Sequence, residues 1–171
     1  MPIARPSDKE TDLLHQWAAP LTPNDTVTVA DGDSCVSIQF GKVIGIFEPG
    51  EHRLPAQIPE GVELWFCATR RMLGTKFGGN VMAGRSAFGD FTFRVAAPHL
   101  LVGHAAGMGS ADGTTEYVKA AVMRGLTHAF GVLPPDPSTM GEAQALAAER
   151  INLELEPLGL NFSGFGTMQV N

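Results

Sequence analysis

A glycine-rich stretch with the spacing of a phosphate-binding loop occupies residues 79–86, GNVMAGRS. In a P-loop, two glycines bracket four residues, and backbone N–H groups at the start of a helix bind the phosphates, assisted by a lysine. Here Arg85 takes the lysine position, and the next residues, AFGDFTFRV, alternate as in a strand instead of beginning a helix. The stretch is therefore predicted to connect two strands. An enzyme that uses nucleotides through Arg85 and Ser86 is the alternative that this pattern leaves open.

Other residues that could bind an ion or take part in catalysis are dispersed along the chain. Arg70, Arg71 and Arg85 are candidates for binding an anion, although a solvated arginine pair at a strand end is the other interpretation of the first two. His99 and His104 are five residues apart, so they do not share a helical face as i, i+4 metal ligands would. The glycine-rich stretch 107–113 matches no nucleotide or hydrolase motif and is predicted to be a loop before a helix. We predict no catalytic residues, no metal site and no cofactor, and hence no enzyme.

The two cysteines, Cys35 and Cys67, lie in apolar segments with the residue types of strands, SCVSI and WFCAT. Free cysteines are among the most buried residues, and disulfides are rare in the cytoplasm. We therefore predict two buried, unlinked thiols.

Charge and hydropathy limit the partners of the chain. Its 171 residues include 12 Lys and Arg against 18 Asp and Glu, a net charge of −6, whereas nucleic acids and anionic lipids require basic patches. The longest apolar runs, such as VIGIF, are far shorter than the ~20 residues that span a bilayer. The first residues, MPIARPSDKE, lack the apolar core of a signal peptide. We expect a cytoplasmic protein without a transmembrane segment and without a nucleic-acid partner.

The first half of the chain is predicted to be a strand meander that follows a short helix. Ser7 and Glu10 have the spacing of a capping box, and Leu13, Leu14 and Trp17 would form one apolar face of this helix before Pro20 ends it. That face is a candidate interface with another molecule, and its alternative role is to pack on the sheet of its own chain. From residue 24 to residue 97, β-rich runs alternate with turn signals such as Asp-Gly-Asp, Gly-Lys and Pro-Gly.

In the second half, the apolar period changes from two to about 3.6 residues, which predicts helices. They are expected at about 114–130 and 139–157, and a strand should follow at 160–170. The sequence thus predicts a single α+β domain over residues 1–171. Its parts are a helical segment at 1–20, a mainly β region at 24–97, a mainly α region at 98–159 and the final strand.

Several motifs in this order resemble one known family. Its members begin with a short helix that ends in Trp. A strand hairpin that resembles VADGDSCVSIQFGKV follows, and then a Pro-Gly turn that resembles EPGEHRL. Further similar stretches are LWFCATRRMLGTKFGG, AFGDFTFRVAAPHLLVGHAAG and LEPLGLNFSGFGTMQV, so nearly the whole chain is covered. The chain thereby resembles the SPFH domain (the stomatin, prohibitin and flotillin superfamily, or band-seven proteins). The similarity is greatest to the soluble bacterial branch called virion core protein-like.

The resemblance implies a non-enzymatic scaffold domain that self-associates or docks a protein partner, with peripheral attachment to a membrane as one setting. Many relatives add a coiled coil or a cysteine-rich zinc ribbon after the domain, whereas this sequence stops at Asn171. We therefore expect a homo-oligomer whose contacts come from the domain itself. A module that binds a small ligand or lipid in the apolar β half is the alternative function.

Overall fold

The chain folds into two units, neither of which is continuous in sequence. The structure is a computed structural model that describes residues 2–70, 72–82, 84–108 and 113–171. Unit 1 consists of Met1–Arg70 and Ala97–Thr114, and unit 2 consists of Arg71–Ala96 and Thr115–Asn171. The sequence predicted one domain without this division, which is visible only in the contacts between distant segments.

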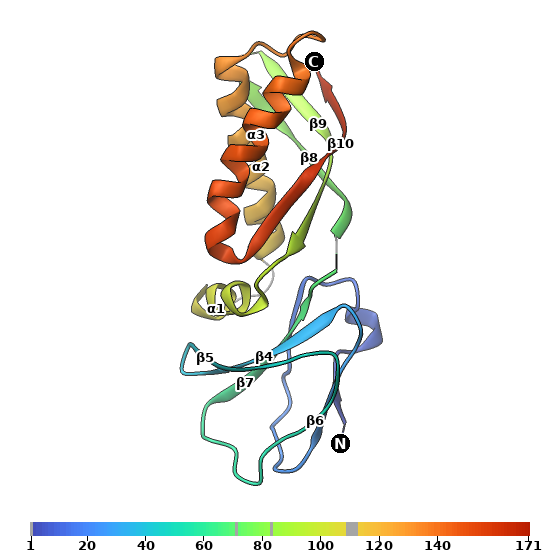
Figure 1. Cartoon of the computed structure of the whole chain (residues 1–171), viewed down its shortest axis with the longest axis vertical. Coiled ribbons are helices and arrows are strands. Elements are labelled where there is room, and N and C mark those ends of the chain that lie inside the picture. Colours follow the sequence, from blue (N-terminus) through green and yellow to red (C-terminus); the bar gives the residue numbers. More distant parts are fainter. Residues whose placement is uncertain (1, 71, 83, 109–112) are drawn as a thin grey trace. The chain divides into compact units, whose positions relative to one another are not determined.

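In its described residues, unit 1 contains two sheets and one α-helix (Figure 1). The strands of the three-stranded sheet are, in order, β1 (Ile3–Ala4), β3 (Thr26–Val29) and β6 (Gly50–Arg53). The strands of the four-stranded sheet are, in order, β2 (Leu14–Gln16), β7 (Val62–Ala68), β4 (Asp33–Gln39) and β5 (Lys42–Phe47). The four-stranded sheet is antiparallel throughout, and β5 lies at its edge. The short connection between β4 and β5 is one of the tight turns that the sequence predicted.

Both faces of the four-stranded sheet are covered by other parts of unit 1. On one face, a buried cluster joins it to the three-stranded sheet; the members are Ile3, Val27, Val29, Cys35, Leu54, Leu64 and Phe66. Helix α1 (Pro98–Met108) contacts β4, β5 and β7 and buries Leu101, Val102 and Ala105. Because both faces are covered, β4 and β7 are buried along most of their length.

The predicted N-terminal helix is wrong. Ser7–Lys9 form a single 3₁₀ turn, η1, without a side-chain cap, and Leu14–Gln16 form β2. Strand β2 pairs with β7, with Leu14 opposite Cys67 and Gln16 opposite Trp65. The capping-box spacing was present, but pairing with a buried strand satisfies the backbone of these residues and outweighs a weak local preference for helix.

Unit 2 is a three-stranded antiparallel sheet with two long helices on one side (Figure 1). The strands are, in order, β10 (Leu160–Val170), β9 (Arg85–Val95) and β8 (Met72–Met82). The helices are α2 (Gly113–Val132) and α3 (Met140–Leu155), and a 3₁₀ turn, η2 (Glu156–Leu158), follows α3. Gly159 then adopts a φ of +73°, which suits glycine, and turns the chain into β10. The predicted helix pair, the final strand and the α+β class are confirmed.

Candidate functional site

The candidate interface at Leu13, Leu14 and Trp17 is divided by the fold. Leu13 and Leu14 are both buried in unit 1, so the leucines pack on the sheet of their own chain. Trp17 is half-buried and packs against the cluster between the two sheets. Its backbone N–H donates to the carbonyl oxygen of Leu64 at 2.9 Å, which extends the pairing of β2 with β7. Of the three residues, Trp17 alone reaches a surface feature, the groove described below.

The arginine candidates for an anion site have separate positions. In unit 1, Arg70 Nη2 donates to the backbone carbonyl oxygen of Glu10, so one of its donors is used within the chain. In unit 2, Arg85 is exposed at the first position of β9. Arg71 lies outside the described residues.

The P-loop spacing at residues 79–86 lies in the β8–β9 hairpin, as predicted for a connection between strands. Gly79 is opposite Ala87, and Asn80 is opposite Ser86. The Ser86 hydroxyl donates to Asn80 Oδ1 at 2.8 Å, and β9 follows where a P-loop would begin a helix. The predicted loop at 107–113 includes residues 109–112, which lie outside the described residues.

The thiols and imidazoles form no reactive cluster in the described part of the chain. Cys35 and Cys67 are free and buried, as predicted, and burial raises the pKa of each thiol to about 12. A thiol with this pKa stays protonated at neutral pH and is a poor nucleophile. His99 and His104 both belong to α1. Among the described residues, no three His, Cys, Asp or Glu side chains lie together as a metal site requires.

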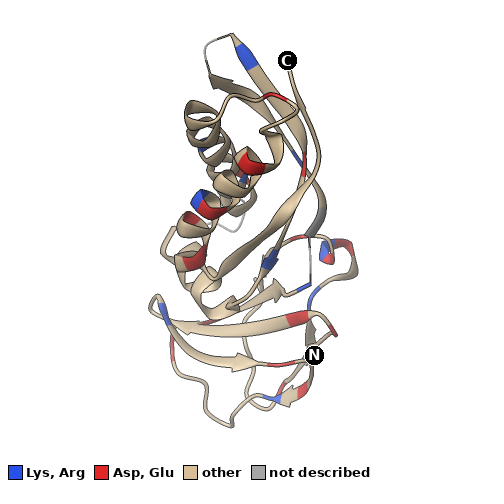
Figure 2. Cartoon of the chain, turned by 45° about the horizontal axis from the view of Figure 1, so that its top comes forward, with Lys and Arg blue, Asp and Glu red and all other residues tan. Residues whose placement is uncertain are grey.

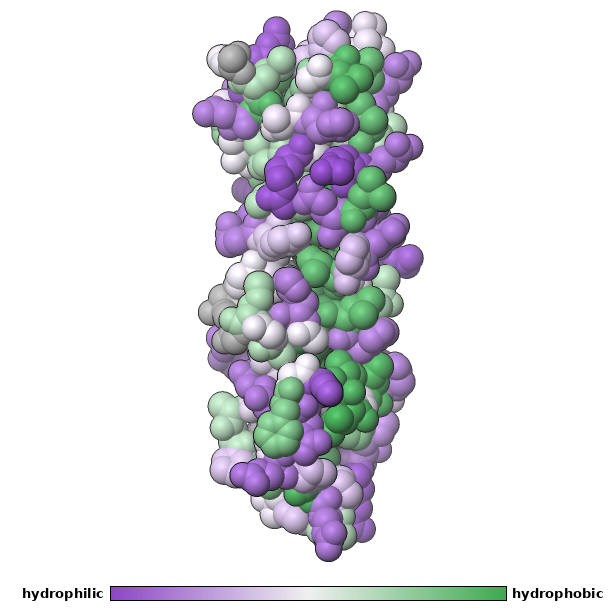
Figure 3. Space-filling view, turned by 90° about the vertical axis from the view of Figure 1, so that its left-hand side faces the viewer, coloured by the Kyte–Doolittle hydropathy of each residue, from purple (hydrophilic) through white to green (hydrophobic). Residues whose placement is uncertain are grey.

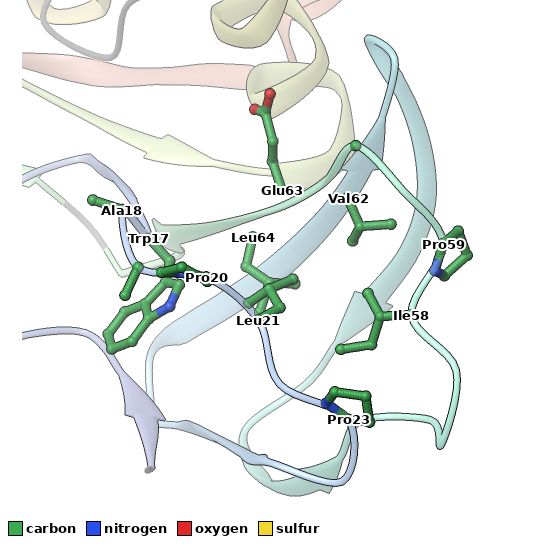
Figure 4. A pocket seen from close by; sticks show the side chains of 12 residues that line it. Trp17, Ala18, Pro20, Leu21, Pro23, Ile58, Pro59, Val62, Glu63 and Leu64 are labelled. Carbon is green, nitrogen blue, oxygen red and sulfur yellow. The ribbon is translucent and has the colours of Figure 1, made fainter.

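An apolar groove opens on unit 1 where the segment after β2 meets the segment after β6 and strand β7. We call it the Trp17 groove; its apolar lining residues are Trp17, Ala18, Ala19, Pro20, Leu21, Pro23, Ile58, Pro59, Gly61, Val62 and Leu64. Its volume is about 490 Å³, within the usual range of ligand pockets. The one charged residue at the groove is Glu63, whose side chain points away from the others (Figure 4). Its carboxylate accepts hydrogen bonds from Gln16 Nε2 and Trp65 Nε1, both at 3.0 Å.

In the described part of the chain, the indole nitrogen of Trp17 is a polar atom without a partner beside this groove. It is buried and has no hydrogen-bond partner within the described residues. A buried Trp N–H usually finds an acceptor, because an unsatisfied donor costs about 1–3 kcal/mol. The donor is shielded from solvent, so what the groove itself presents is a wall of mainly apolar side chains.

Strand β5 adds an exposed apolar edge beside the groove. A smaller cavity of about 200 Å³ is lined by Ile44, Gly45 and Phe47 of β5 and shares Leu21, Ile58, Pro59, Val62 and Leu64 with the groove. Three β5 side chains are markedly exposed for apolar residues: Val43 at 38%, Ile44 at 51% and Ile46 at 42%. The β4–β5 hairpin faces the viewer in Figure 3, and apolar side chains gather in that part of unit 1.

An exposed edge of this kind is unusual because unpaired N–H and C=O groups invite another strand. Native edges are commonly protected by inward-pointing charges, by proline or by a bulge. In β5 the single charged residue is Lys42, at the end of the strand, and a bulge at Ile44 is the one protecting feature. This exposed edge was not predicted from the sequence. The signal was the run KVIGIF, which lacks the polar alternation of a half-buried strand, although such a run equally indicates a strand buried on both faces.

The described residues form neither a basic patch nor a helix suited to crossing a membrane. The described Lys and Arg residues are scattered instead of gathered on one face (Figure 2). None of the helices in the described ranges combines the length and the apolar character that crossing a bilayer requires.

Comparisons with protein-family models and with curated proteins gave no match. The resemblance to the SPFH domain therefore rests on the sequence motifs alone. The surface formed by β5 and the Trp17 groove is the main candidate for a binding site.

Proposed function

We propose that the chain is a non-enzymatic assembly module of the SPFH type, acting in the cytoplasm, and that it binds another protein through the edge of β5. The observation that carries the proposal is the exposure of Val43, Ile44 and Ile46 on a strand with one free edge. Adding a strand satisfies the free backbone groups and removes apolar side chains from water, at about 25 cal/mol per Å² of apolar surface. Free cysteines with a pKa of about 12 are consistent with a role that involves no chemistry at the thiols.

A photo-crosslinking residue at position 44 tests the proposal directly. We expect p-benzoylphenylalanine at position 44, in cells that produce the protein, to form covalent adducts with protein under ultraviolet light. The matched control is position 153, because Leu153 is 64% exposed on α3 of unit 2 and belongs to no feature of the proposal. Adducts no more abundant at 44 than at 153 would refute the proposed function.

A small apolar ligand is the second candidate, because the Trp17 groove has the volume of a ligand pocket and is lined mainly by apolar side chains. Native mass spectrometry of protein purified from its host should then detect a bound molecule. Trp17→Ala removes the aromatic side chain from the groove wall, so it should lower the retained fraction. Protein that carries no extra mass in either form would reject this candidate.

Peripheral membrane attachment stays a prediction, and sedimentation with anionic lipid vesicles tests it.

A further inference from the structure

We infer that the partner of β5 is β5 of a second copy of the chain, paired antiparallel about a two-fold axis that passes between Ile44 and Gly45. The inference rests on the proposed function and specifies its partner. It follows from the faces on which the β5 side chains lie, from the irregularity in its pairing with β4 and from the charges at its two ends.

The bulge in β5 decides which side chains share a face. Ser37 of β4 is opposite Gly45 and Ile38 is opposite Val43, so Ile44 is an extra residue in β5. A bulge of this kind places two consecutive residues on the same side of the sheet. Ile44 and Gly45 accordingly both line the smaller cavity, together with Phe47.

The side chains of Val43 and Ile46 lie on the face that carries α1. A Cβ added to Gly103 of α1 would be 3.8 Å from Val43 Cγ2, so Val43 faces the helix. Val43 is opposite Ile38, and Ile46 is opposite Val36. Residues 36 and 38 of one strand point to the same side, so Ile46 shares the face of Val43.

One antiparallel register pairs all six β5 residues with their counterparts in a second copy. In that register Val43 is opposite Ile46 of the other copy, and Ile44 is opposite Gly45 of the other copy. Each of these pairs occurs twice by symmetry, and the two members of each pair lie on the same face of the combined sheet. Gly45 leaves room for the Ile44 side chain above it.

In a register shifted by one residue, paired side chains no longer lie on the same face of the combined sheet. If the axis passed through Gly45, Ile44 would be opposite Ile46 of the other copy, and the two side chains would lie on opposite faces. A shift by one residue always exchanges faces in a regular strand. In β5 the bulge makes the full-length register the one in which the faces agree, which is the complementarity that an isologous contact requires.

The charges at the ends of β5 favour the antiparallel direction. Lys42 begins the strand and Glu48 follows its last residue, and both are exposed. In the proposed register Lys42 is opposite Phe47 of the other copy, and Glu48 of that copy is the next residue, so opposite charges approach each other diagonally at both ends of the interface. Parallel pairing would instead set like charges beside each other, which is unfavourable between neighbouring strands.

The contact is small. Six residues from each strand are fewer than the roughly 20–30 residues a side of a standard protein interface. We therefore expect a reversible dimer with a dissociation constant in the micromolar range, and self-association should depend strongly on concentration.

Sedimentation velocity of the full chain tests the dimer. Between about 1 µM and about 300 µM the protein should change from monomer to dimer. Ile46→Lys should stay monomeric over this range with an unchanged circular dichroism spectrum, because Ile46 is exposed and a lysine blocks an edge. Leu153→Lys on α3 is the matched control and should dimerise as the natural chain does. A natural chain that is monomeric at the highest concentration, or an Ile46→Lys variant that dimerises normally, would overturn the inference.

A pair of cysteine variants tests the register. When Val43→Cys and Ile46→Cys proteins are mixed under mild oxidation, disulfide-linked dimers should form, because facing residues of paired strands lie within reach of a disulfide. Each variant alone should give far fewer, and the two natural cysteines should not interfere because both are buried. Equal linking in the separate proteins and in the mixture would contradict the register.

The two proposals fail in different ways. Adducts at position 44 that contain other proteins but never a second copy would leave the proposed function intact and reject the dimer. A lack of adducts above the level at position 153 would reject both.

Discussion

The buried ion pair between Arg5 and Asp33 offers a demanding test of how unit 1 is held together. Both side chains are at most 5% exposed, and Arg5 Nη1 donates to Asp33 Oδ1 at 3.0 Å. Arg5 Nη2 also donates to the carbonyl oxygens of Leu13, at 3.3 Å, and Phe66, at 3.2 Å. One side chain thus joins the segment after β1 to β4, to β7 and to the residues just before β2.

Replacing Arg5 by Met keeps an apolar stem and removes the charge and the donors. A buried carboxylate left without its partner costs about 3–5 kcal/mol. Each carbonyl group that loses its donor adds roughly 0.5–1.5 kcal/mol. We therefore expect Arg5→Met to lower the free energy of unfolding of unit 1 by about 5 kcal/mol, a large part of the stability of an ordinary domain.

The loss should depend on pH. Burial raises the pKa of Asp33 above its ordinary value, although Arg5 and Arg70 act in the opposite direction. Removing Arg5 must raise this pKa further. A carboxyl group with a raised pKa in the folded state contributes stability that is present at low pH and is lost as the pH rises through that pKa. The deficit of Arg5→Met should thus be smallest near pH 4, close to the ordinary pKa, and largest at neutral pH.

Tryptophan fluorescence during urea unfolding measures this effect in the right place, because the two tryptophans of the chain, Trp17 and Trp65, both belong to unit 1. Arg53→Met is the matched control, since Arg53 is exposed on β6 and its loss should cost less than about 0.5 kcal/mol. If Arg5→Met fell within about 1 kcal/mol of this control at neutral pH, the assumed cost of an unpaired buried carboxylate would be refuted.

Three further predictions concern other parts of the chain. Gly125 of α2 approaches α3 so closely that a Cβ would lie 2.5 Å from Ile151 Cγ1, so Gly125→Ala should destabilise unit 2 by about 1–3 kcal/mol in thermal unfolding. Gly131→Ala in the same helix meets no atom within 4 Å and should stabilise it by roughly 0.5–1 kcal/mol; equal effects of the two changes would contradict the close approach. Thiol titration should count two free thiols in denatured, unreduced protein and show very slow reaction of the native protein, since burial holds both pKa values at about 12. Millimolar ATP with magnesium should leave the melting temperature unchanged, and an increase that Arg85→Ala abolishes would show that the β8–β9 hairpin binds nucleotide after all.

The parts of the fold that the sequence predicted are those with long, regular patterns. Helices α2 and α3 each carry a stripe of buried residues at helical spacing over several turns, and the strands of the first half have recognisable turns between them. Helix α1 was not named because its sequence, PHLLVGHAAGM, has no polar residues besides two histidines and therefore shows no apolar stripe against a polar face. The 3₁₀ turn and strand in place of an N-terminal helix were unpredictable for another reason. A strand of three residues is too short for alternation to appear, and its partner β7 lies about 50 residues further along the chain.

The candidate surface could not be predicted either, because it is formed by residues that are distant in the sequence. That β5 is an edge strand depends on the order of strands in the sheet, which no local pattern encodes. Trp17 was singled out from the sequence, but the groove that it lines also needs Ile58 and Pro59 from a distant segment. Arg5 and Asp33 are 28 residues apart, and nothing near either residue in the sequence indicates that they pair.

The discontinuity of the two units sets the order in which a ribosome can complete them. Helix α1, which covers β4, β5 and β7, emerges from the ribosome only after the whole β8–β9 hairpin of unit 2. Until then, the apolar face that carries Trp65 and Val36 has no helix to cover it. The nascent chain therefore passes through a stage at which an exposed apolar face and an open strand edge are present together, the kind of intermediate on which chaperones act. The sheet of unit 2 is completed later still, because β10, which pairs with β9, is the last of the strands to emerge.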